Sequence, residues 1–202
     1  MKLISLLLIL HLAHNRDHVA DKQYFSVWRG DDKVGTLTTW QRKEGSRTAY
    51  YLCSDVEFNL LWSVKVNEQI TEIFENGNLQ TSSHLRHVND DLRVSNQVVT
   101  CANGYQISNI HNEITRLVEA IPFSVLSLYF HEPLDQQRAY SQSHRQFVTL
   151  RETKQHVFRI DLPNGAVTTY SYHDGLLQQA ESKSYVGTIR FVRDVNNELT
   201  KK

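Results

Sequence analysis

Several features that would narrow the function of this chain are scarce or missing. It contains 2 cysteines, 3 prolines and 1 methionine among 202 residues, and its formal net charge is zero. Cys53 and Cys101 form no Cys-x-x-Cys pair, which argues against a zinc or dithiol site. A neutral chain also lacks the basic excess typical of nucleic-acid-binding domains. We therefore expect no metal, no cofactor and no nucleic-acid partner.

Long apolar runs are also scarce, apart from one at the N-terminus. Lys2 precedes the apolar run 3–10, which is too short to span a bilayer as a stable anchor. We interpret residues 1–20 as an export signal, cleaved after Ala13 or Ala20. Residues 21–195 are then expected to form one antiparallel β domain, with a polar tail at 196–202. The mature protein is predicted to be soluble, without a transmembrane anchor, in the periplasm or outside the cell.

Export bears on the two cysteines, because disulfides persist in oxidising compartments. Cys53 and Cys101 are therefore a possible disulfide pair. The alternative is that each is a free thiol buried as a small apolar residue.

Most of the chain alternates apolar and polar residues in short runs. The run 50–60 places Tyr50, Leu52 and Val56 on one face and polar residues on the other, as a half-buried strand requires. Turn sequences such as Glu75-Asn-Gly-Asn78 separate neighbouring runs. These short connections predict an all-β fold, a curved antiparallel meander or half-barrel of about ten strands. The segment 79–96 is poor in large apolar residues and is expected at a solvated sheet edge.

The segment from Pro122 to Pro133 does not alternate. Proline is favoured in the first turn of a helix, so one short helix that starts at Pro122 and ends before Pro133 is expected to pack on the sheet. A buried strand is the alternative, since periodicity alone does not separate the two for a short apolar run.

Three sets of residues carry a resemblance to a known family. They are Leu128-Tyr-Phe-His-Glu-Pro133, Val27-Trp-Arg-Gly30 with Val34-Gly-Thr-Leu37, and Leu162-Pro-Asn-Gly165 with Tyr170-Ser-Tyr172 and Gly175. In their order along the chain, these sets resemble domain-of-unknown-function family 6134, a family of exported bacterial proteins. The resemblance implies a β-rich envelope domain, distantly similar to the curved half-barrels of lipoprotein-carrier type. It implies no established activity.

Candidate catalytic and metal-binding pairs are weak. His84 and His87 are three residues apart, so on a strand they point to opposite faces. The adjacent pairs His131–Glu132 and His173–Asp174 lack a nucleophile on a glycine-rich elbow. We expect a non-enzymatic protein.

Binding of an apolar, lipid-like ligand in the concave sheet is the leading hypothesis. Its alternatives are a filled core, an interaction module for another envelope protein, and a hydrolase without a recognisable motif. The oligomeric state is not predicted. The residues expected to line the ligand site are Trp28, Trp40, Trp62, Phe74, Phe123, Leu126, Tyr129 and Tyr170.

Overall fold

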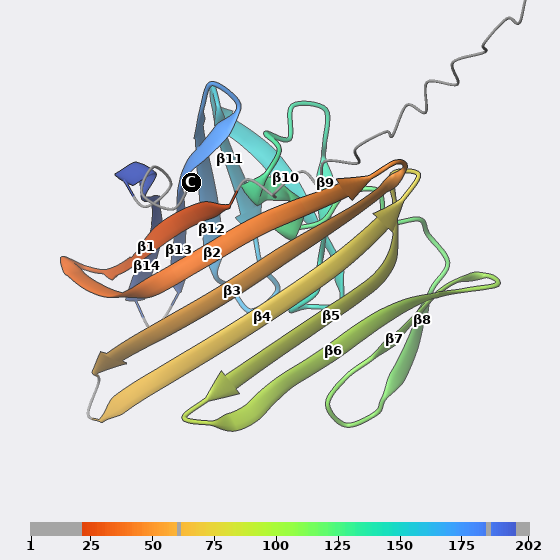
Figure 1. Cartoon of the computed structure of the whole chain (residues 1–202), viewed down its shortest axis with the longest axis horizontal. Coiled ribbons are helices and arrows are strands. Elements are labelled where there is room, and N and C mark those ends of the chain that lie inside the picture. The colour runs from red at the N-terminus through yellow and green to blue at the C-terminus, as the bar shows by residue number, and fades with distance from the viewer. Residues whose placement is uncertain (1–21, 60–61, 185–186, 197–202) are drawn as a thin grey trace, which may run out of the picture.

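The alternating runs of the sequence form the strands of one antiparallel sheet (Figure 1). The structure is a computed structural model that describes residues 22–59, 62–184 and 187–196. The predicted export signal 1–20 lies outside the described residues, as does all of the predicted tail 196–202 except its first residue. No helix in the described ranges is long and apolar enough to cross a membrane.

The sheet consists of two arms, which we name by their order in the chain. The N-terminal arm contains β1 (Gln23–Arg29), β2 (Asp32–Glu44), β3 (Arg47–Asn59), β4 (Ser63–Glu75), β5 (Asn78–Val88), β6 (Asp91–Cys101), β7 (Gly104–Ser108) and β8 (Ile114–Leu117). The C-terminal arm contains β9 (Arg138–Ser141), β10 (Gln146–Lys154), β11 (Val157–Asp161), β12 (Val167–His173), β13 (Leu176–Ser184) and β14 (Gly187–Arg193).

The first and last strands join the two arms. β1 pairs with β2 on one side and with β14 on the other, so that Val27 lies opposite both Gly35 and Phe191. From this junction each arm proceeds as a meander, which leaves β8 and β9 at the two edges of the sheet. Figure 1 shows the long strands β2–β6 side by side, with β11–β14 behind them. The predicted class, an antiparallel meander of half-barrel type, is confirmed.

The number of strands is higher than expected. The described residues contain 14 strands rather than about ten. Of the strands that the sequence did not predict, β8 and β9 have only four residues each, and three of the four in β8 are exposed. A run of four residues is too short for an alternation of apolar and polar residues to be recognised in a sequence.

The segment that connects the two edge strands runs through the inside of the half-barrel. We call residues 121–131 the plug. Its only helix is η1 (Leu126–Tyr129), one 3-10 turn, so the helix expected from Pro122 to Pro133 is much shorter. Before η1 the plug is extended: Val125 N donates to Tyr140 O and Tyr140 N donates to Phe123 O, both at 2.9 Å. These bonds pair the plug with the edge strand β9, which is why a helix does not start at the proline.

The plug fills the concave side of the sheet. Leu126 is 2% exposed and Leu128 is 0% exposed. The ring of Tyr129 meets Phe25 of β1 edge-on, with centroids 5.5 Å apart. The hydroxyl of Tyr172, from β12, donates to Leu128 O at 2.7 Å. The plug therefore contacts both arms and contributes a large part of the core.

Two further expectations are wrong. The segment 79–96 is no solvated edge, because β5 and β6 lie inside the sheet and His84 is completely buried. His84 and Arg86 bond to Glu68 of the neighbouring strand β4, a contact that the composition of 79–96 alone does not reveal. The cysteines also differ from both alternatives: Cys53 and Cys101 are free and exposed, on β3 and on the end of β6.

Candidate functional site

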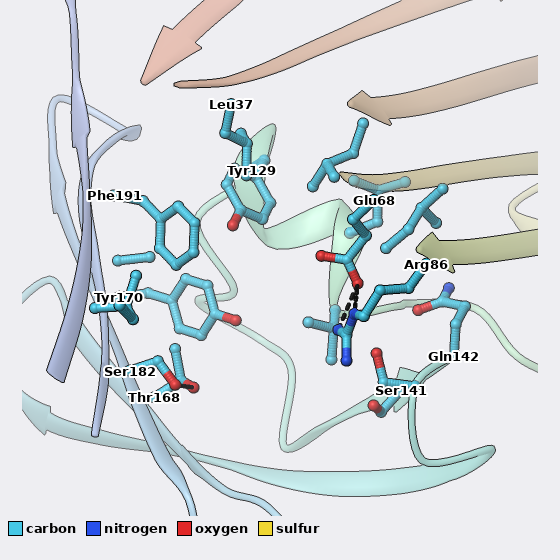
Figure 2. A pocket seen from close by; sticks show the side chains of 17 residues that line it. Leu37, Glu68, Arg86, Tyr129, Ser141, Gln142, Thr168, Tyr170, Ser182 and Phe191 are labelled. Atoms are coloured by element: carbon cyan, nitrogen blue, oxygen red, sulfur yellow. Dashed lines mark hydrogen bonds and ion pairs between the residues drawn. The ribbon is translucent and has the colours of Figure 1, made fainter. Parts of the chain in front are cut away.

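A pocket of about 270 Å³ lies between the two arms, next to the plug (Figure 2). Its walls come from distant parts of the chain, which the junction of β1 and β14 brings together. The lining residues are Leu37, Leu52, Glu68, Ile70 and Arg86 from the N-terminal arm, Val125, Leu126 and Tyr129 from the plug, Ser141, Gln142 and Ser143 from the end of β9 and the turn after it, and Thr168, Tyr170, Ala180, Ser182, Ile189 and Phe191 from the C-terminal arm.

The lining is amphipathic. Aliphatic and aromatic side chains from β2, β3, β14 and η1 form most of the wall. The charged groups come from β4 and β5, and the hydroxyl groups come from β12, β13 and the end of β9 with the turn after it. Figure 2 shows the guanidinium of Arg86 and the hydroxyl of Tyr170 directed into the space between the arms. Such a lining suits a ligand that is apolar with a few polar groups.

A network of three residues holds the charged part of the wall. Glu68 Oε1 accepts hydrogen bonds from Arg86 Nη2 at 2.5 Å and from Arg86 Nε at 3.1 Å. The same oxygen lies 2.7 Å from Nε2 of His84, which is fully buried. Since β4 and β5 are neighbours, with Glu68 opposite Arg86, the register of the sheet sets this geometry.

The network determines the ionisation of Glu68. Burial opposes the charged form, but the hydrogen bond from His84 and the charge of Arg86 outweigh it and lower the pKa of Glu68 to about 2. Glu68 is therefore a carboxylate at neutral pH. On the other side of the pocket wall, burial lowers the pKa of His144, and the charges of Arg86 and His84 lower it further.

The turn after β9 places polar groups at the same end of the pocket. Asn96 Nδ2 donates to Gln142 O at 2.8 Å, which fixes the turn against β6. The side chain of Gln142 is only 3% exposed, and its Nε2 has no hydrogen-bond partner among the described residues. A buried donor of this kind loses its solvation without compensation unless a ligand or water accepts its hydrogen.

A second buried acid lies on the same strand as Glu68. Glu72 is 0% exposed, and its Oε2 accepts a hydrogen bond from Ser124 Oγ of the plug at 2.5 Å. Its Oε1 has no partner among the described residues, and the hydroxyl of Tyr140 also has none. Burial raises the pKa of Glu72 to about 8, although the bond from Ser124 opposes this. Glu72 is thus neutral at pH 7 and anchors the plug.

The structure brings together three of the eight residues predicted to line a ligand site. Leu126, Tyr129 and Tyr170 line the pocket. Phe74 belongs to the hydrophobic core and the half-buried Phe123 packs against it, but neither lines the pocket.

The three tryptophans lie away from the pocket. Trp40 stacks on Tyr51 with ring centroids 5.0 Å apart. Its neighbour Thr39 is fully buried, and because successive side chains of a strand point to opposite faces, Trp40 faces outward. Trp62 is 64% exposed in the turn before β4. Trp28 is half-buried near the end of β1 and is not in the pocket wall. The assignment of the tryptophans to a concave lining is therefore wrong, because alternation places Trp40 on the convex face.

The candidate acid–base pairs have separate contacts. Glu132 Oε1 lies 2.7 Å from Nδ1 of His156, in the turn between β10 and β11. His131 Nε2 lies 2.9 Å from the hydroxyl of Tyr50. His173 Nε2 lies 3.4 Å from Asp174 Oδ2, but both side chains are exposed and lie in the turn between β12 and β13. These groups do not converge on one place.

Sequence reasoning missed the residues that give the pocket its polarity. Every second residue of β4 faces the core. Ile70 and Phe74 are the apolar residues on this face, and Glu68 and Glu72 are acids on the same face. An acid on an apolar face signals a buried polar network. The partners of Glu68 in this network, His84 and Arg86, lie in the segment that the sequence analysis assigns to a solvated edge.

The fold and the pocket define a class: an open antiparallel β half-barrel with an internal plug and an amphipathic pocket. The chain belongs to the family described as "Domain of unknown function (DUF6134)", whose match covers residues 25–194. This confirms the family resemblance that the segment from Leu128 to Pro133 suggested.

A solved structure has a similar fold. It is the crystal structure of a beta-barrel-like protein of domain of unknown function DUF1849 from Brucella abortus, with a TM-score of 0.53 and 9% sequence identity. The similarity covers 87% of this chain and 95% of that one. At this identity it supports the fold alone. No curated protein sequence matches the chain significantly.

Proposed function

We propose that this is a non-enzymatic, exported envelope protein that binds an apolar, lipid-like ligand in the pocket between its arms. The observation that carries the proposal is the pocket of about 270 Å³ beside the plug. Its size is close to the lower end of the range of small-molecule sites, about 300–1,000 Å³. Leu126, Tyr129 and Tyr170 would contact the ligand.

The proposal has more support than an interaction module. A protein that recruits partners by strand addition needs a long exposed edge. Both edge strands have four residues, and the backbone of Phe123 and Val125 already pairs with β9. Catalysis has no positive support from the site, since the candidate acid–base pairs do not converge.

A cavity-filling variant tests binding. Ala180 is 1% exposed and lines the pocket, so Ala180→Leu places additional atoms in the ligand's space. Ala102→Leu, at an exposed turn, is the matched control. Titration with an environment-sensitive apolar fluorophore should show binding to the wild type and to Ala102→Leu, and at least tenfold weaker binding to Ala180→Leu. Equal binding by all three would mean that the pocket is not the site.

Native mass spectrometry of protein purified from its own host gives an independent test of binding. We expect a fraction with the added mass of an apolar molecule, and this fraction should disappear in Ala180→Leu. The same spectra test export, because the mature protein should lack residues 1–13 or 1–20. An intact N-terminus on the folded protein would contradict export.

A further inference from the structure

The polar groups of the pocket point to a more specific ligand. We propose that it is an amphiphile with a single anionic head group such as a carboxylate, bound at Arg86 with its apolar chain along the wall formed by β2, β3, β14 and η1. This inference rests on the proposed function, since it names the chemical class that the same pocket takes.

Arg86 has donors available for the head group. Its bonds to Glu68 use Nε and Nη2, and none of the hydrogen bonds among the described residues uses Nη1. The side chain is 35% exposed and reaches into the pocket (Figure 2). A planar guanidinium that is held in place by one carboxylate can still bind a second anion through its remaining N–H groups.

Other polar groups in the lining can also donate hydrogen bonds. Gln142 Nε2 is a buried donor without a partner among the described residues. Ser141, Ser143 and Tyr170 add hydroxyl groups to the lining, and hydroxyls can donate. The one acceptor-only side chain in the lining is Glu68, whose Oε1 already receives hydrogen bonds from Arg86. An acceptor-rich head group would satisfy these donors, whereas an ammonium group would not.

The local charge does not oppose an anion. Glu68 and Arg86 offset each other, and Glu72 is neutral at pH 7 because its pKa is about 8. His84 and His144 are the remaining titratable groups next to Arg86, and both are bases. A bound carboxylate would therefore meet no uncompensated negative charge in this part of the pocket.

The apolar part of the pocket limits the chain. A methylene group fills about as much space as a liquid water molecule, roughly 30 Å³. A pocket of about 270 Å³ thus holds roughly nine groups of this size, with the head group included. Decanoate is therefore at the upper limit of length for a probe.

Three probes with the same chain separate head-group recognition from apolar binding: decanoate, 1-decanol and decylamine. Each is titrated below its micelle concentration at neutral pH by displacement of the apolar fluorophore. For the wild type we expect decanoate to bind about 10- to 100-fold more tightly than 1-decanol, as a charge-assisted hydrogen bond allows. Arg86→Gln should reduce this preference to within about threefold. A far-ultraviolet circular-dichroism spectrum like that of the wild type shows that the variant is folded.

Two further variants complete the test. Arg86→Lys keeps the charge and should retain most of the preference for decanoate. Glu68→Gln removes the competing carboxylate and should retain or strengthen it. Equal binding of all three probes by the wild type, or tightest binding of decylamine, would overturn the anionic head group while leaving the apolar pocket intact. Binding of none of the probes would instead contradict the proposed function itself.

Discussion

Glu68 and Glu72 lie four residues apart on the same inward face of β4, yet they have opposite environments. Glu68 contacts a guanidinium and an imidazole, and its pKa falls to about 2. Glu72 contacts one hydroxyl of the plug, and its pKa rises to about 8. The pair shows that the kind of partner, rather than burial itself, decides whether an inward acid is charged.

The difference divides the concave side of the sheet into two regions. The region around Glu68 is open to the pocket and holds fixed charges. The region around Glu72 is closed, and the plug occupies it. The first has the features of a binding site, and the second has those of a structural core. Three substitutions test this division and a fourth, on the convex face, is the comparison; they follow in order of decreasing expected effect.

Leu128→Ala tests whether the plug is core. Because Leu128 is fully buried, its truncation should lower the free energy of unfolding by about 2–5 kcal/mol. Urea denaturation measures the change. Leu134→Ala, at a 68% exposed position nearby, is the control and should change it by less than about 0.5 kcal/mol. Similar small losses for both would mean that the plug does not stabilise the fold.

Glu72→Gln tests the closed region through pH. An unfolded glutamate ionises near pH 4.5, whereas folded Glu72 keeps its proton to about pH 8. Between these values the folded state binds the extra proton, so raising the pH destabilises the wild type by up to about 1.4 kcal/mol per unit. Glu72→Gln should remove this dependence of stability on pH. The free energy of unfolding of the variant, relative to that of the wild type, should rise by on the order of 3 kcal/mol from pH 5 to pH 8. Parallel stability curves for both proteins would show that Glu72 is ionised in the fold.

Glu68→Gln tests the open region and should act in the opposite direction. The folded pKa of about 2 lies below the unfolded value of 4.5, so Glu68 stabilises the fold above pH 4.5 and loses this effect as the pH falls toward 2. At pH 7 the variant should lose about 1–2 kcal/mol, less than for a fully buried pair because Arg86 is 35% exposed. Urea denaturation of the wild type and the variant at pH 7 and at pH 3 measures the loss of stability at each pH. A loss that is no smaller at pH 3 would contradict the ion pair.

Trp40→Ala tests neither region and should have the smallest effect. Its stack with Tyr51 on the convex face contributes about 0.5–1.5 kcal/mol. Fluorophore binding should not change, whereas Tyr170→Ala, which alters the pocket wall, should weaken it. If Trp40→Ala weakened binding as strongly as Tyr170→Ala, the ligand would lie on the convex face.

The sequence predicted those parts of the structure that depend on local patterns. Alternation at Tyr50, Leu52 and Val56 correctly placed their side chains in the core, and Asn-Gly pairs marked hairpins such as the one between β4 and β5. The apolar content of the segment around Leu128 correctly indicated an element of different packing. Each of these follows from the nearest neighbours in the chain.

The parts that failed depend on distant contacts. The 3-10 turn is short because Phe123 and Val125 bond to Tyr140 of β9. Composition favours an edge for His84, because nothing in 79–96 shows that its imidazole meets the carboxylate of Glu68 on the neighbouring strand β4. Trp40 was assigned to the pocket by residue type, although its neighbour Thr39 is the one that faces inward. The pocket itself exists only where the two arms meet, so no single segment encodes it.

The junction of β1 and β14 also constrains the order of folding. Ser26 Oγ donates to Asp194 Oδ2 at 3.3 Å, although these residues are 168 positions apart. One side of β1 therefore stays without its partner strand until nearly the whole chain has been synthesised. Such non-local pairing is slow to form, and it makes completion of the sheet the last event for a newly made chain. A nascent chain would thus stay incompletely folded until its last strand has been made.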